Sequence, residues 1–208
     1  MFDVIGKWTF AAATSAALLV SLAPRVQAEP LKASFASVGD ETSVPYGWVD
    51  FCSRYAGECQ DDDRAPQPIR LTVGAMKTIQ QINVTVNREI EAVSDMDHWG
   101  VVDQWDIPSD GRGDCEDFAL LKRKLLMKAG FPRQALLMTV VKEANGEGHA
   151  ILTVKTDQGE FALDNLDDAI KPWNKTPYRF VKRQSEMNQN VWVAIGAPTA
   201  APAYVSQK

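Results

Sequence analysis

The apolar residues between positions 71 and 95 recur with the period of one helix face. They follow one another at spacings of three or four: Met76, Ile79, Ile82, Val86, Ile90 and Val93. This spacing predicts an amphipathic helix over 71–95. A second helix is predicted from Asp114, whose side chain can cap it, to Gly130, with Pro132 just beyond.

Beyond the second helix the pattern changes to short apolar runs that are rich in β-branched residues. These runs lie at 135–141, 150–154, 160–163, 178–181 and 191–195. Turn signals separate several of them, at Asn145-Gly146 and at Asp157-Gln158-Gly159. Helices followed by a meandering antiparallel sheet predict an α+β domain. Residues 96–113, between the two helices, are interpreted as a loop.

The first 28 residues have the pattern of a secretory signal peptide. A short head with Lys7 precedes an apolar run over 8–23, and Val26 and Ala28 place small residues before a cleavage site. The alternative is a membrane anchor, but the run is shorter than the ~20 residues that a spanning helix needs. We therefore expect a periplasmic or secreted protein with no membrane span in its mature form.

The charge balance of the chain is acidic. It has 22 Lys and Arg residues against 27 Asp and Glu residues, which gives a net charge of −5. A surface that binds a polyanion carries the opposite sign. Nucleic acid is therefore excluded as an expected partner.

Three cysteines in a chain sent to an oxidising compartment predict one disulfide and one unpaired thiol. Cys52 and Cys59 lie seven positions apart, so we pair them, which leaves Cys115. Residues 29–70 are predicted to be an irregular segment that this disulfide staples. The predicted core is 71–195, and the Ala- and Pro-rich residues 196–208 are predicted to be a flexible tail.

Cys115 falls in the first turn of the second predicted helix. Unsatisfied backbone N–H groups and the helix dipole stabilise a thiolate at that position. A cysteine nucleophile also needs a base, and a hairpin over 149–164 would bring His149 beside Asp164, which would orient the imidazole. Each residue has a purely structural alternative: a buried small side chain, a hairpin cap and a turn former.

The chain resembles the bacterial transglutaminase-like cysteine peptidases, the LapG-like family of periplasmic proteases. The motifs that carry the resemblance are Gly113–Ala119, Gly148-His149-Ala150 and Leu163-Asp164-Asn165, and it spans about 45–195. It implies a papain-like or transglutaminase-like core with N-terminal helices and an antiparallel sheet. It also implies Cys115 as nucleophile, His149 as general base and Asp164 as the orienting acid.

The same resemblance implies Ca²⁺, because calcium-dependent members of the family bind it through acids that Asp114 and Glu116 match here. Carboxylates beside a thiol raise its pKa, and a divalent cation with oxygen ligands would offset their charge. The alternative is that Asp114 only caps the helix and Glu116 only favours its dipole. Asp117 is a less favoured calcium ligand than these two, because each helical residue is rotated by about 100° from the one before it.

An oxyanion formed by attack on a carbonyl also needs hydrogen-bond donors. The backbone N–H of Cys115 is one, and the indole of Trp105 is the candidate for a second, with Trp99 as its rival. Both tryptophans have an alternative as anchors of the loop over 96–113.

Three functions are consistent with these residues. The first is a cysteine endopeptidase that acts on a protein substrate; the resemblance implies a cell-surface adhesin whose cleavage releases biofilm, and an inner-membrane cyclic di-GMP receptor as regulator. The second is acyl transfer to an amine, which uses the same acyl-enzyme. The third is a noncatalytic, calcium-stabilised binding module with a buried structural thiol.

Overall fold

The computed structural model describes Met1 and residues 33–61, 64–196 and 205. The chain divides into two units, Met1–Pro30 and Leu31–Lys208, and every helix and strand below lies in the second. The predicted signal peptide over 1–28 lies outside the described residues, apart from Met1. Within the described part of the chain, no helix combines the length and the apolar character required to cross a membrane.

A seven-stranded antiparallel sheet with the order β1-β9-β8-β4-β5-β6-β7 forms the centre of the fold. Its strands are β1 (Val38–Thr42), β4 (Leu136–Lys142), β5 (Gly148–Thr156), β6 (Gly159–Leu163), β7 (Lys171–Pro172), β8 (Arg179–Gln184) and β9 (Trp192–Ile195). The sheet is not a simple meander, because β8 pairs with β4 on the side opposite to β5. A separate parallel pair joins β2 (Glu91–Ala92) to β3 (Arg112–Gly113).

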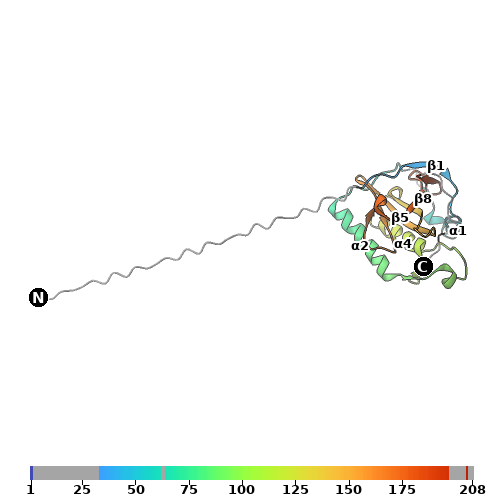
Figure 1. Cartoon of the computed structure of the whole chain (residues 1–208), viewed down its shortest axis with the longest axis horizontal. Coiled ribbons are helices and arrows are strands. Elements are labelled where there is room, and N and C mark those ends of the chain that lie inside the picture. The colour runs from blue at the N-terminus through green and yellow to red at the C-terminus, as the bar shows by residue number, and fades with distance from the viewer. Residues whose placement is uncertain (2–32, 62–63, 197–204, 206–208) are drawn as a thin grey trace. The chain divides into compact units, whose positions relative to one another are not determined.

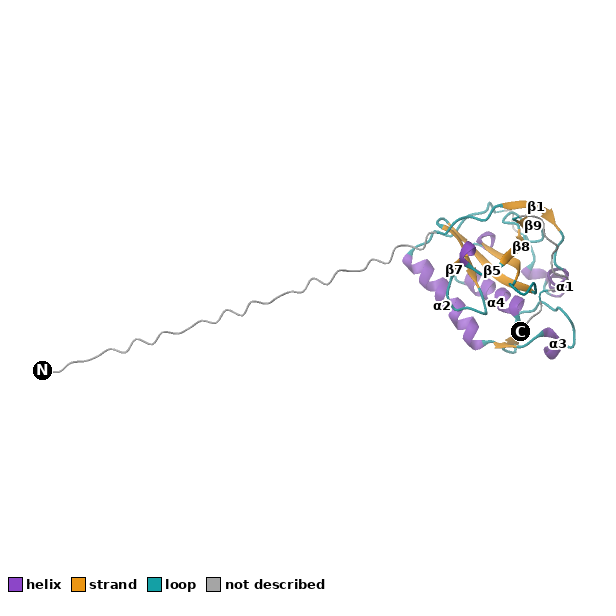
Figure 2. Cartoon of the chain, viewed as in Figure 1, coloured by secondary structure: helices purple, strands orange, loops and turns teal. Residues whose placement is uncertain are grey.

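Three helices pack on one face of this sheet: α1 (Tyr46–Arg54), α2 (Val73–Glu89) and α4 (Cys115–Lys128). Figures 1 and 2 show α2 and α4 beside the strands. The short α3 (Asp95–His98) and three 3₁₀ turns, Ala56–Glu58, Arg133–Ala135 and Trp173–Lys175, complete the helical elements of the described residues. The predicted α+β class is therefore confirmed.

Apolar clusters line both faces of the sheet. The larger cluster joins the three helices to residues such as Met138 and Leu152, and the smaller one lies on the opposite face with Ile151 and Phe180. Because neighbouring residues of a strand point to opposite faces, Ile151 and Leu152 belong to different clusters. The interior strand β5 is thus buried on both faces, like its neighbour β4.

The segment 29–70 is more regular than predicted. Its residues 38–42 form β1, which pairs with β9 at the edge of the sheet, and 46–54 form α1. Trp48 and Phe51 of α1 are buried in the main core, and the predicted Cys52–Cys59 disulfide is present. The interpretation of 29–70 as an irregular segment missed these two elements, because α1 has only two strongly anchoring apolar side chains and β1 is mostly exposed and polar.

The predicted helix over 71–95 is confirmed as α2, but it is shorter. Thr72 caps its N-terminus by accepting a hydrogen bond from the N–H of Ala75 at 3.0 Å. The helix ends at Glu89, because the chain continues in extended form into β2, which pairs with β3. The predicted loop over 96–113 therefore contains most of α3 and all of β3.

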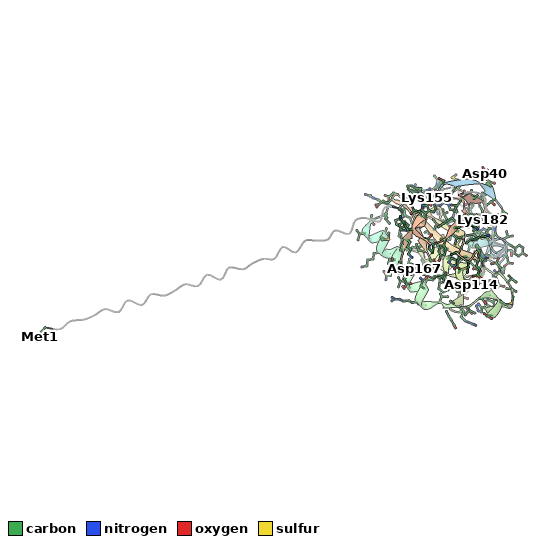
Figure 3. The ribbon with its side chains drawn as sticks, viewed as in Figure 1. Met1, Asp40, Asp114, Lys155, Asp167 and Lys182 are labelled. Atoms are coloured by element: carbon green, nitrogen blue, oxygen red, sulfur yellow. A yellow bond between two sulfur atoms is a disulfide. The ribbon has the colours of Figure 1, made fainter. Side chains whose placement is uncertain are left out.

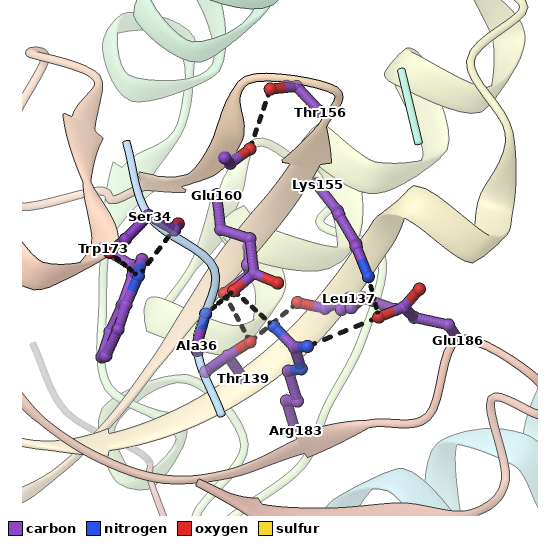
Figure 4. A network of polar contacts seen from close by, with 12 residues as sticks. Ser34, Ala36, Leu137, Thr139, Lys155, Thr156, Glu160, Trp173, Arg183 and Glu186 are labelled. Carbon is purple, nitrogen blue, oxygen red and sulfur yellow. Dashed lines mark hydrogen bonds and ion pairs between the residues drawn. The ribbon is translucent and has the colours of Figure 1, made fainter. Parts of the chain in front are cut away.

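A buried ion pair ties the strands together on the face away from the helices (Figure 4). Arg183 Nη1 of β8 and Glu160 Oε2 of β6 lie 2.7 Å apart, and both side chains are almost completely buried. The same Glu160 oxygen accepts a hydrogen bond from the backbone N–H of Ala36 at 3.2 Å. This contact attaches the segment before β1 to the sheet.

Candidate active site

Cys115 is the first residue of α4 and lies beside the first residues of β5. Because β6 pairs with β5 only as far as Leu152, it leaves the N–H of Ala150 without a strand partner on that side. This N–H donates to the Cys115 sulfur. Asp114 occupies the predicted N-cap position, but its side chain does not cap the helix and instead accepts from the N–H of Asp95 at 3.3 Å.

His149 and Asp164 meet across the β5–β6 hairpin, as the spacing predicted. Leu152 pairs with Leu163, so Asp164 follows opposite Ile151, and His149 shares the face of Ile151. His149 Nε2 and Asp164 Oδ1 are 2.9 Å apart, and both side chains are nearly fully buried. This bond leaves Nδ1 as the ring nitrogen that a base acting on Cys115 would use.

Three polar side chains that the sequence did not single out hold Asp164 in place. The hydroxyl of Tyr178 donates to Asp164 Oδ2, and the Tyr178 ring packs against His149 with centroids 5.2 Å apart. The backbone carbonyl of Asp164 accepts from Lys122 Nζ at 2.8 Å and from Asn87 Nδ2 at 2.9 Å. Burial raises the pKa of Asp164, but its bonds to His149 and Tyr178 outweigh burial and leave it below the usual value.

Two oxygens lie within reach of the single proton of the Cys115 thiol, one of a carboxylate and one of a backbone carbonyl. Its sulfur lies 3.0 Å from Glu116 Oε2 and 2.9 Å from the backbone oxygen of Val205. Among the described residues it has no hydrogen bond to His149. Burial raises the pKa of Cys115 well above its ordinary value, and the charges of Glu116 and Asp114 raise it further. In this state the cysteine is a thiol.

Acidic side chains gather next to this thiol. The cluster contains Asp114, Glu116 and Asp117 from the start of α4 and Asp95, the first residue of α3. All four side chains are buried. Groups of three among these carboxylates and Asp103 have oxygen atoms within 4.8 Å of one another. Figure 3 labels Asp114 within the domain. The sequence pointed to Asp114 and Glu116, whereas Asp95 is brought in by the fold.

The acidic cluster fits a hard cation. Within the described residues, Glu116 Oε1 and Asp117 Oδ2 are buried and accept no hydrogen bond. Burial, and then the charge of Asp114, raise the pKa values of both carboxyl groups well above their ordinary range. Oxygen ligands held this close suit Ca²⁺, whose charge would offset theirs. Asp114, Glu116, Asp117 and Asp95 are the residues that would hold it.

Trp105 lies fully buried between Trp48 and Trp192, with its ring edge-on to both. Its indole N–H donates to Asp103 Oδ1 at 3.1 Å. The predicted oxyanion donor is therefore engaged with a carboxylate in this structure. The rival candidate Trp99 stacks on His98 and is 47% exposed, away from the buried thiol.

A cysteine at a helix start, beside an antiparallel sheet that carries a His–Asp pair, is the arrangement typical of the papain-like and transglutaminase-like thiol enzymes. The profile of the family described as bacterial transglutaminase-like cysteine proteinase matches residues 38–200. The chain belongs to this family, and it is accordingly a cysteine peptidase. Comparison with curated proteins gave no match.

Solved structures agree with this fold. The calcium-bound LapG of Legionella pneumophila is 21% identical, with a TM-score of 0.50 over 61% of this chain and 74% of that one. A second LapG structure from this organism is 23% identical, with a TM-score of 0.49 over 58% and 69%. The family match and the similarity to the calcium-bound structure confirm the predicted transglutaminase-like core.

Proposed function

We propose that this cysteine peptidase is an endopeptidase that works through Cys115, His149 and Asp164. The observation that carries the proposal is the 2.9 Å bond between His149 and Asp164 on the strand pair whose open edge faces the Cys115 sulfur. The bond uses Nε2 and so fixes the imidazole tautomer with Nδ1 as the proton acceptor.

In the proposed reaction His149 removes the proton from the Cys115 thiol, and the sulfur attacks the carbonyl carbon of the scissile peptide bond. His149 then gives that proton to the leaving amine, and a thioester remains on the sulfur. Water hydrolyses the thioester with His149 again acting as base. The backbone N–H of Cys115 donates to the oxyanion, since the Trp105 indole is engaged with Asp103.

We further propose that the acidic cluster holds Ca²⁺. The buried carboxylates that raise the pKa of Cys115 oppose thiolate formation, so this site needs a compensating positive charge. A calcium ion held by Asp114, Glu116, Asp117 and Asp95 would supply that charge beside the nucleophile. The name of one similar structure, calcium-bound LapG, supports the choice of ion.

The location and the substrate are proposed from sequence features. The predicted signal peptide over 1–28 favours a periplasmic or secreted enzyme. The resemblance to the LapG-like family favours a cell-surface adhesin as substrate and an inner-membrane cyclic di-GMP receptor as regulatory partner.

Digestion of a proteome-derived peptide library tests the peptidase proposal without knowledge of the natural substrate. We expect the wild-type protein with Ca²⁺ to generate new peptide termini that mass spectrometry detects, and the Cys115→Ala variant to generate none. Equal products from both proteins would contradict the proposal. A labelled primary amine added to the same digestion tests acyl transfer, because amine incorporation in excess of hydrolysis would favour a transferase.

A further inference from the structure

Val205 is the described residue of the predicted tail that lies beside the candidate nucleophile. Its side chain is only 3% exposed and belongs to the main apolar core, together with Trp105 and Cys115. A loose tail does not predict this position. Gly196 is the last residue described directly after β9. Nine residues later in the sequence, Val205 contacts the body of the domain.

The contacts of Val205 use its backbone. Its carbonyl oxygen accepts from the Cys115 thiol at 2.9 Å, and its N–H donates to the carboxylate of Asp103. Trp105 holds the same carboxylate through its indole N–H at 3.1 Å. Val205 is thus held at both its carbonyl and its N–H. The carbonyl contacts the Cys115 sulfur, and the N–H contacts Asp103.

We propose that the position between Cys115 and Asp103, which Val205 occupies here, binds the backbone of a substrate peptide. Asp103 then accepts the N–H of the residue that donates the acyl group, and Val205 is an intramolecular competitor of substrate. The inference rests on the proposed peptidase function and names the substrate-binding mode of the same site. Asp103 is then a substrate-binding residue, and Trp105 is the positioning residue that orients its carboxylate.

The geometry favours this assignment over simple packing of a tail. A peptide whose carbonyl lies at the nucleophilic sulfur is in the place that the acyl donor must take before attack. Backbone contacts of this kind select no particular side chain, whereas the buried environment of Val205 favours an apolar residue there. Both features suit a site that binds a segment of another protein.

The test measures the rate at which iodoacetamide labels Cys115 at one fixed pH in EGTA, in chains that begin at residue 29. A chain that ends at Gly196 lacks Val205, and a control chain that ends at Ser206 keeps it. We expect the shorter chain to be labelled at least about tenfold faster than the full chain, the factor for a thiol that Val205 covers about nine-tenths of the time. The control should behave as the full chain.

A peptide with the sequence of residues 197–208, added to the shorter chain, should slow the labelling in a saturable manner, and a scrambled peptide should not. Asp103→Ala in the shorter chain should weaken the protection at least about fivefold, while Asp103→Asn, which keeps an acceptor oxygen, should retain most of it. Full-length Val205→Gly, with its melting temperature recorded, gives a second comparison if truncation unfolds the domain.

Equal labelling of the full and shortened chains would overturn the proposal. Faster labelling that the peptide does not reverse would also overturn it, because the tail would then only stabilise the fold. Failure of the proposed peptidase function is recognised separately, since it is read from the products of library digestion and not from access to the thiol.

Discussion

We expect the metal-free protein to lose stability as the pH rises from 5 to 7, because several carboxyl groups near Cys115 have raised pKa values. Burial is the main cause that raises the pKa of Asp103, to about 6; the bond from Trp105 opposes it and the charge of Asp95 adds to it. An aspartate in the unfolded chain titrates near ~3.9. Between these two values the folded state binds more protons than the unfolded state, so the free energy of unfolding falls as the pH increases.

The size of this effect follows from the two pKa values. From pH 5 to pH 7 the folded Asp103 releases its proton while the unfolded one is already ionised, which lowers the free energy of unfolding by ~1 kcal/mol. In a domain of this size that corresponds to a fall of roughly 3 °C in melting temperature. The raised pKa values of Glu116 and Asp117 add in the same direction.

The assay is thermal unfolding in EGTA and in excess Ca²⁺ at pH 5, 6 and 7. The window ends at pH 7 because burial lowers the pKa of Lys122 to about 7, and that group adds stability as the pH rises further. With Ca²⁺ the fall should disappear, since the bound ion favours the ionised carboxylates. Asp103→Asn is the matched control and should reduce the fall in EGTA. A melting temperature that rises or stays constant in EGTA would show that these carboxyl groups do not bind extra protons in the folded state.

Two further substitutions test other contacts. Tyr178→Phe removes the hydroxyl that donates to Asp164, so we expect kcat/KM on a cleaved library peptide to fall about tenfold with KM unchanged. The bond from Tyr178 lowers the pKa of Asp164, so its loss should move the acid limb of the profile of kcat/KM against pH to higher pH. An unshifted limb would argue against a positioning role for Tyr178. Arg183→Met leaves Glu160 buried without its cation and should cost about 3 kcal/mol in denaturant unfolding. The double variant with Glu160→Leu should recover most of that loss, and no recovery would contradict the ion-pair account.

The parts of the fold that the sequence predicted correctly depend on local periodicity. The core of α2 follows from apolar residues three and four apart, and α4 follows from its start at Asp114 and its glycine end. The His149–Asp164 contact was also predictable, since a hairpin with a short turn fixes which residues share a face. These features require only neighbouring stretches of chain.

The parts that the sequence did not predict depend on contacts between distant segments. Asp95 joins the acidic cluster because the β2–β3 pair brings α3 to the start of α4, and nothing in its local sequence signals a ligand. Tyr178 reaches Asp164 from a loop that precedes β8. Val205 lies in a segment whose Ala- and Pro-rich composition indicates no ordered contact, so its place beside Cys115 had no local signal.

In the proposed mechanism His149 activates Cys115 as the nucleophile. The most direct measurement compares the iodoacetamide labelling rate of Cys115 in wild type and in His149→Ala, each in the chain that ends at Gly196 and in the presence of Ca²⁺. We expect wild type to be labelled at least about tenfold faster, which corresponds to one unit in the pKa of the thiol. Equal rates in the two proteins would contradict this mechanism.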